Sequence, residues 1–321
     1  MTRDATCEFA MEYISELRLG YWPQVSQNGV CKKIELESFC IEALPNIQET
    51  IEYIGKHEFA SDKWFYPPLE YDITSKRQDG HQPKIQTGRF TLPSTHVIKT
   101  KNEPLDKDFL YFIVAVIGIL IGMRLLPEGW GHFYKVSIKY GSTSDLNCCS
   151  IKDIAYVLNM SERFWKSSSP KIRKTMFGAM HWFLFAESYQ HQFEKFGILY
   201  TVLDACSNVY KEKYGRNEKN EQNHSRRLIA LAGYFSIPKP SWAEIRSDNT
   251  SEISRLRNEF IHEAQYAGKP IGFHYSSETN KIYLGLQAFN NRLILGLLGI
   301  KCGYIKSSVE TNQMHGLSLS E

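Results

Sequence analysis

The sequence lacks the short motifs of the commonest nucleotide-dependent and hydrolytic enzymes. Its 321 residues contain no phosphate loop of the GxxxxGKS/T type, no GxGxxG dinucleotide fingerprint and no GxSxG nucleophile turn, and no internal repeat is visible. These absences argue against P-loop nucleotidases, nicotinamide-dependent dehydrogenases, α/β-hydrolases and repeat scaffolds.

The cysteines form no recognisable metal or disulfide pattern. There are seven of them, an odd number, with no CxxC pair and with Cys148 directly beside Cys149. Such usage is typical of a reducing compartment. Because the N-terminus also lacks a charged-then-apolar signal pattern, we expect a cytoplasmic protein. The histidines lack metal-ligand spacing with any carboxylate or cysteine, so neither a metal nor another cofactor is predicted.

Neither sign of charge dominates. The chain has 38 Lys and Arg against 35 Asp and Glu, a net charge of +3. This balance permits RNA as a partner without requiring it, because a nucleic-acid interface is marked by a clustered basic patch. A hydrophobic content of 42% with 23% charged residues indicates a globular protein.

No apolar run reaches the length of about 20 residues that a membrane-spanning helix needs. The longest, residues 109–123, has 15 residues before Arg124. Its length fits a fully buried helix of an α-helical core, and no stable membrane insertion is expected. A membrane anchor over residues 109–126 remains an alternative at this stage.

The chain is predicted to be mainly α, with a helical bundle in its C-terminal half. Residues 1–103 form a mixed N-terminal region of unknown role, residues 104–306 a helical region, and residues 307–321 a polar tail. Helices are expected near residues 151–165, 171–189, 191–214, 224–235, 250–267 and 286–298, and a strand or extended connection at 132–140.

The segment with the most chemical content is the expected helix 250–267. Asn249 and Glu252 resemble a capping box at its start, and Gly268 with Pro270 marks its end. At about 100° per residue, Arg257 falls within an apolar face, whereas Asn258 and His262 project to the other side. A guanidinium in an apolar face either snorkels to water or pairs with a buried carboxylate. Asp204, on an apolar helix, is the candidate supporting carboxylate for such a pair.

Arg257, Asn258 and His262 have the spacing of the RNxxxH signature of HEPN-domain ribonucleases. The flanking residues 256–264, LRNEFIHEA, and 268–272, GKPIG, resemble the end of an Apea-like HEPN domain, and residues 179–210 are similar to its first two helices. The resemblance covers about residues 171–304. It implies a HEPN-like helical bundle with a site that usually forms between two copies of the domain.

The resemblance implies that Arg257, Asn258 and His262 are catalytic. Histidine transfers protons near neutral pH, and arginine stabilises the negative charge of a phosphorane. Asn258 would orient the imidazole or bind phosphate. Residues that could contact RNA come from basic clusters: Lys171, Arg173, Lys174, Arg226 and Arg227.

The expected function is therefore metal-independent RNA endonuclease activity, with attack by the 2′-OH and release of a 2′,3′-cyclic phosphate. Toxins and antiviral defence effectors are the roles implied by the resemblance, with a homodimer and a regulatory or antitoxin partner. The alternative is a non-catalytic HEPN scaffold that binds RNA or a protein. Family toxins silenced by AMPylation carry Tyr two residues after the histidine. Ala264 stands there instead, so that mode of control is not implied.

Overall fold

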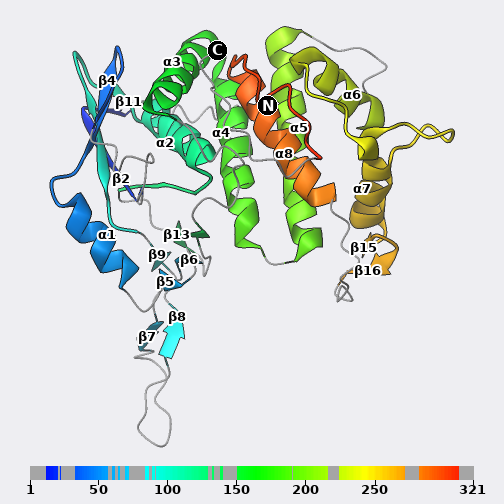
Figure 1. The fold of residues 1–321 in the computed structure, drawn as a ribbon, viewed down its shortest axis with the longest axis horizontal. Coiled ribbons are helices and arrows are strands. Elements are labelled where there is room, and N and C mark those ends of the chain that lie inside the picture. Colours follow the sequence, from blue (N-terminus) through cyan, green and yellow to red (C-terminus); the bar gives the residue numbers. More distant parts are fainter. Residues whose placement is uncertain are drawn as a thin grey trace, which may run out of the picture.

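The computed structural model describes residues 12–20, 22, 33–56, 92–128, 150–189, 191–215, 224–271 and 282–310. It also describes short strands at 60–61, 64–65, 69–71, 84–86, 89–90, 132–133 and 138–139. Within these ranges the chain is mainly α, as predicted, with a smaller β region at its N-terminal end (Figure 1).

The helices follow the predicted order closely after residue 104. They are α1 (Ile47–Gly55), α2 (Lys107–Ile121), α3 (Ile151–Ser167), α4 (Pro170–Phe185), α5 (Gln192–Tyr214), α6 (His224–Phe235), α7 (Glu252–His262) and α8 (Ile282–Leu297), with 3₁₀ turns η1 (Ala186–Ser188) and η3 (Ser241–Ala243). Figure 1 shows α4, α5 and α8 side by side in the middle of the molecule, with α6 and α7 at one end.

A five-stranded antiparallel sheet lies at the opposite end, in the order β12-β2-β10-β4-β3. Its strands are β2 (Glu16–Gly20), β3 (Lys33–Glu35), β4 (Phe39–Ala43), β10 (His96–Thr100) and β12 (Leu126–Pro127). In β2, buried Leu17 and Leu19 alternate with exposed Glu16 and Arg18, as expected for a strand with one face on a core.

The remaining strands are short pairs. β1 (Tyr13–Ile14) pairs with β11 (Leu105–Asp106), and β15 (Gln265–Tyr266) with β16 (Lys269–Pro270). The others are β5 (Ala60–Ser61), β6 (Trp64–Phe65), β7 (Leu69–Tyr71), β8 (Lys84–Gln86), β9 (Arg89–Phe90), β13 (His132–Phe133) and β14 (Ile138–Lys139). The last two lie within the segment 132–140 that was predicted to be extended.

The apolar run at 109–123 forms α2, which is buried along nearly its whole length. It contacts α3, α4 and β12, and Phe109 packs edge-on against Phe39 of the sheet with 6.0 Å between ring centroids. Gly122 ends the helix in the left-handed conformation, at φ 67°. No helix in the described ranges has both the length and the apolar character of a membrane span.

One hydrophobic core joins the sheet to the helices. It runs from Leu17 and Ile98 through α2 to Leu293 and Val309. The expected boundary at residue 103 therefore does not coincide with a break in the core. At the other boundary, residues 307–310 pack against α8, where Arg292 donates to the backbone oxygen of Ser307 at 3.2 Å. The rest of the predicted tail, 311–321, lies outside the described residues.

Candidate active site

Helix α7 is shorter than predicted at both ends. It starts after Ser251, and Asn249 stands outside it with φ 62°. It ends at His262, because Ala264 takes the left-handed conformation at φ 53° and the chain turns into the β15–β16 hairpin. Ala267 and Gly268, both at positive φ, form the two-residue turn of that hairpin.

Glu259 ties the hairpin to the helix. Its carboxylate accepts a hydrogen bond from the backbone N–H of Gly268 at 3.1 Å and forms an ion pair with Arg255 one turn earlier. The end of α7 is thereby held against the segment that follows it. His262 stands at this fixed end.

Arg257, Asn258 and His262 converge at the exposed end of α7. Arg257 Nη1 donates to Asn258 Oδ1 at 3.1 Å and contacts His262 Nε2 at 3.1 Å. Because a guanidinium only donates, Nε2 of His262 is the acceptor in this contact and carries no proton there. The three residues of the signature thus form one hydrogen-bonded group within a single chain.

The facing of the helix agrees with the prediction only in part. Asn258 and His262 are exposed, as expected, and the buried positions are Ile253, Ser254 and Leu256. Arg257 is half-buried instead of within the apolar face, and Ile261 is 56% exposed. The face is centred where Phe260 of α7 packs against Phe196 of α5, at 6.2 Å between centroids. The long Arg257 side chain bridges the angle of about 140° that separates it from His262 on an ideal helix.

The predicted pairing of Arg257 with Asp204 is also wrong. Asp204 forms its ion pair with Arg227 of α6, one of the residues assigned to RNA binding. Arg227 also donates to His224 Nδ1 at 2.8 Å, and the same nitrogen lies 2.9 Å from Tyr200 Oη. Tyr200, Asp204, His224 and Arg227 therefore make a second polar group, formed between α5 and α6.

The two polar groups act on each other electrostatically through Arg257. Burial lowers the pKa of His224, and the positive charges of Arg227 and Arg257 lower it further. Burial raises the pKa of Tyr200 to about 12, and the negative charge of Asp204 adds to this. His224 is thus neutral at physiological pH, with Nδ1 as the acceptor and its proton on Nε2.

Sequence reasoning missed Tyr200 and His224. The available signal was spacing, because Tyr200 and Asp204 are four residues apart on α5, and His224 and Arg227 are three apart on α6. Each pair therefore lies on one helix face. Nothing in the sequence alone indicates that these two faces meet beside α7.

The other basic candidates do not gather around α7. Lys171, Arg173 and Lys174 lie in the first turns of α4, where Lys171 pairs with Glu212 at 2.8 Å and Arg173 stacks on Trp165. Arg226 lies on α6 and is exposed. In the described ranges, no group of three or more His, Cys, Asp or Glu side chains is arranged to hold a metal ion.

Comparisons of this chain with protein-family models, curated proteins and solved structures found no match.

Proposed function

We propose that the protein is a metal-independent RNA endonuclease of the HEPN type, with Arg257, Asn258 and His262 in its active site. The observation that carries the proposal is the group at the end of α7, where one guanidinium contacts both Asn258 and His262. A fixed cation beside an exposed imidazole is what phosphodiester cleavage by an internal nucleophile requires.

In the proposed reaction, His262 Nε2 takes the proton of a ribose 2′-OH, and the 2′-oxygen attacks the adjacent phosphorus. Arg257 donates hydrogen bonds to the non-bridging oxygens of the phosphorane. The bond to the 5′-oxygen then breaks, this oxygen takes up a proton from water, and His262 returns its proton to the solvent. The products are a 2′,3′-cyclic phosphate and a 5′-OH. Arg257 also occupies Nε2 in the free protein, so its movement onto the phosphate would release that nitrogen.

The second polar group supports this role for Arg257. Asp204 forms its ion pair with Arg227, and Arg257 forms no ion pair with a carboxylate among the described residues. The guanidinium therefore remains available to a phosphate.

The test is cleavage of a labelled RNA by the purified chain in excess EDTA, with end groups read by mass spectrometry. We expect cyclic phosphate ends, and no cut where the nucleotide 5′ of the scissile bond is 2′-deoxy. His262→Ala and Arg257→Ala should each reduce cleavage about 100-fold or more. RNA binding without cleavage by the folded wild type would favour the non-catalytic scaffold instead.

Two matched controls separate chemistry from folding. Glu252→Ala changes a charged residue at the other end of the same helix, and Glu263→Ala changes the exposed neighbour of His262. Both should cleave like wild type. None of the four variants should lower the free energy of unfolding by more than about 1 kcal/mol, because all four side chains lie at or near the surface.

We further propose that the active form is a homodimer, as the family resemblance implies. The angle between Arg257 and His262 on the helix does not require a second chain, since the two side chains meet within one chain. What supports it is Ile261, a large apolar side chain that is 56% exposed directly beside His262. Light scattering at micromolar concentration tests this, and a fully active monomer would exclude it.

We propose a toxin or defence effector as the biological role, with RNA as the substrate and a regulatory or antitoxin partner. Expression of wild type should then arrest growth and degrade cellular RNA, whereas His262→Ala at the same level should do neither. Equal growth of both strains, with both proteins folded, would contradict the role but not the enzymatic activity.

A further inference from the structure

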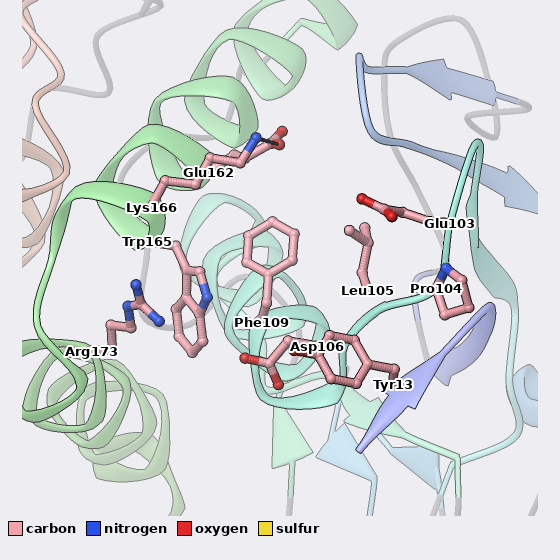
Figure 2. Close-up of a pocket in the computed structure, with 10 residues that line it drawn as sticks. All are labelled: Tyr13, Glu103, Pro104, Leu105, Asp106, Phe109, Glu162, Trp165, Lys166 and Arg173. Atoms are coloured by element: carbon pink, nitrogen blue, oxygen red, sulfur yellow. Dashed lines mark ion pairs between the residues drawn. The ribbon is translucent and has the colours of Figure 1, made fainter. Parts of the chain in front are cut away.

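A cavity of about 770 Å³ opens between β11, α2 and α3 (Figure 2), elements that lie far from α7 in Figure 1. Its walls come from four places in the sequence: β1, the β11–α2 junction, the C-terminal half of α3 and the start of α4. The volume lies in the range of pockets that bind small molecules or single side chains. Nothing in the proposed ribonuclease reaction uses this cavity.

Three aromatic rings surround the space. Phe109 of α2 and Trp165 of α3 lie 5.7 Å apart between centroids, tilted by 50°. Tyr13 of β1 lies across from them and is 59% exposed. Aromatic faces that meet around one space attract cations through their quadrupoles.

Two carboxylates line the same space without an opposite charge. Neither Glu103 nor Asp106 forms an ion pair within the described part of the chain. One oxygen of Asp106 accepts the N–H of Asp108 at 3.0 Å and caps α2. In Figure 2, Glu103 reaches toward the cavity from one wall and Asp106 lies at the foot of Phe109.

The two cations at the cavity are engaged elsewhere. Lys166 forms an ion pair with Glu162 at 2.6 Å, and Glu162 also accepts from the hydroxyl of Ser38. Arg173 stacks on Trp165 at 5.0 Å, and Figure 2 shows the indole between Arg173 and Phe109. Outside the Glu162–Lys166 pair, the lining carries two negative charges, on Glu103 and Asp106, against the one positive charge of Arg173, a net of −1.

We propose that this cavity binds an organic cation, an alkylammonium or guanidinium group, between the rings of Tyr13, Phe109 and Trp165. Glu103 and Asp106 accept its N–H groups. The aromatic walls receive the alkyl part, while exposed Glu103 and half-buried Asp106 meet the charged end at the mouth of the cavity. A free polyamine and a basic side chain of a partner protein share this chemistry.

The experiment is isothermal titration calorimetry of the full chain at low ionic strength with spermidine and with agmatine. We expect saturable binding that weakens as salt is added. Asp106→Asn keeps a good helix cap while removing the charge, and Glu103→Gln is an exposed isosteric change. Each of these two substitutions should raise Kd about tenfold, which corresponds to the lower end of the range of free energies for a hydrogen bond to a charged group.

Asp108→Asn is the matched control, because it removes a carboxylate from the same helical turn outside the cavity. It should bind like wild type. Tyr13→Leu, which keeps apolar volume but removes an exposed ring, should weaken binding of both cations. Circular dichroism of each variant establishes that it is folded.

A blocked arginine tripeptide distinguishes the two sources of the ligand. Tighter binding of the peptide than of free agmatine points to a protein partner, and the reverse points to a free polyamine. The proposal is overturned if no cation binds at millimolar concentration, or if Glu103→Gln and Asp106→Asn both bind the cations as tightly as wild type does. Binding of AMP that depends on Arg173, in place of the cations, would also overturn it.

Discussion

Arg124 is a buried charge with an unusual environment. It lies just after the end of α2 and is 4% exposed, and none of its three guanidinium nitrogens has a hydrogen-bond partner among the described residues. The guanidinium lies 5.1 Å from the centre of the Phe185 ring. Burial lowers the pKa of Arg124 to about 10. An unpaired buried guanidinium destabilises the folded state, because water no longer solvates it.

Replacement of Arg124 by methionine should therefore stabilise the protein. Met has a similar length and no charge, so the free energy of unfolding should rise by about 1–3 kcal/mol. Urea denaturation measures the change. Arg124→Lys, which retains a buried cation, serves as the control and should give no gain. A less stable Arg124→Met variant would show that the guanidinium has an anionic partner in solution.

His181 gives the protein a pH-dependent stability. Burial, together with the positive charge of Arg124, lowers its pKa from 6.5 to about 4. In the unfolded chain His181 is therefore protonated below about pH 6.5, whereas in the folded chain it is protonated only below about pH 4. The free energy of unfolding should fall by about 2–3 kcal/mol as pH drops from 6.5 to 4.

This part of the pH dependence should be absent in His181→Phe, which keeps a ring stacked between Phe177 and Phe185. Denaturation curves between pH 4 and 7.5 test it. An identical slope in wild type and His181→Phe would show that other groups carry the acid sensitivity.

At the scale of elements, the sequence predicted helices well where apolar spacing and caps agreed. The Ser150–Asp153 capping box and Pro170 fix the starts of α3 and α4, and both lie in the sequence as local signals. The end of α7 could not be predicted in the same way. Ala264 and Ala267 are good helix formers, and only the hairpin contacts, including Glu259 with Gly268, hold them at positive φ.

The close contact between α5 and α7 depends on Gly197. A Cβ at this position would lie 2.7 Å from the ring of Phe260, so Gly197→Ala must displace that ring and with it the helix that carries His262. We expect a loss of about 1–3 kcal/mol in stability and a loss of RNA cleavage by the proposed enzyme. Thermal unfolding and the cleavage assay measure the two effects.

The double variant Gly197→Ala with Phe260→Leu should recover part of both losses, because the smaller side chain makes room for the methyl group. Gly178→Ala on α4 is the matched control, since a Cβ there meets nothing within 4 Å. Its stability should stay the same or rise slightly. Failure of the double variant to recover either property would mean that Gly197 matters for another reason.

At the scale of the whole molecule, the sequence predicted a mixed N-terminal region over residues 1–103 and a helical region over residues 104–306. Described residues of both share one core, and β12 at residues 126–127 pairs with β2 at residues 16–20. Pairing between strands so far apart leaves no local pattern. The same holds for the site. The RNxxxH spacing is local and can be seen in the sequence, whereas the second polar group forms only where α5 and α6 meet.

A fragment of residues 104–321 should therefore fail to fold by itself. It would expose the face of α2 that packs against Phe39 and leave β12 without its partner. Circular dichroism and binding of a hydrophobic dye measure this, with the full chain as reference. A fragment with a cooperative unfolding transition and no dye binding would show that the helical region is an independent domain.

The order of strands in the sheet also determines when its parts can assemble. β2 leaves the ribosome more than a hundred residues before β12, the edge strand that pairs with it, and also before the helices that share its hydrophobic core. At about 5–20 residues per second, Leu17 and Leu19 wait roughly 5–20 s for these elements. During that interval the nascent chain presents an uncovered strand to other proteins, so its yield in the cell should depend on chaperones that bind early in synthesis.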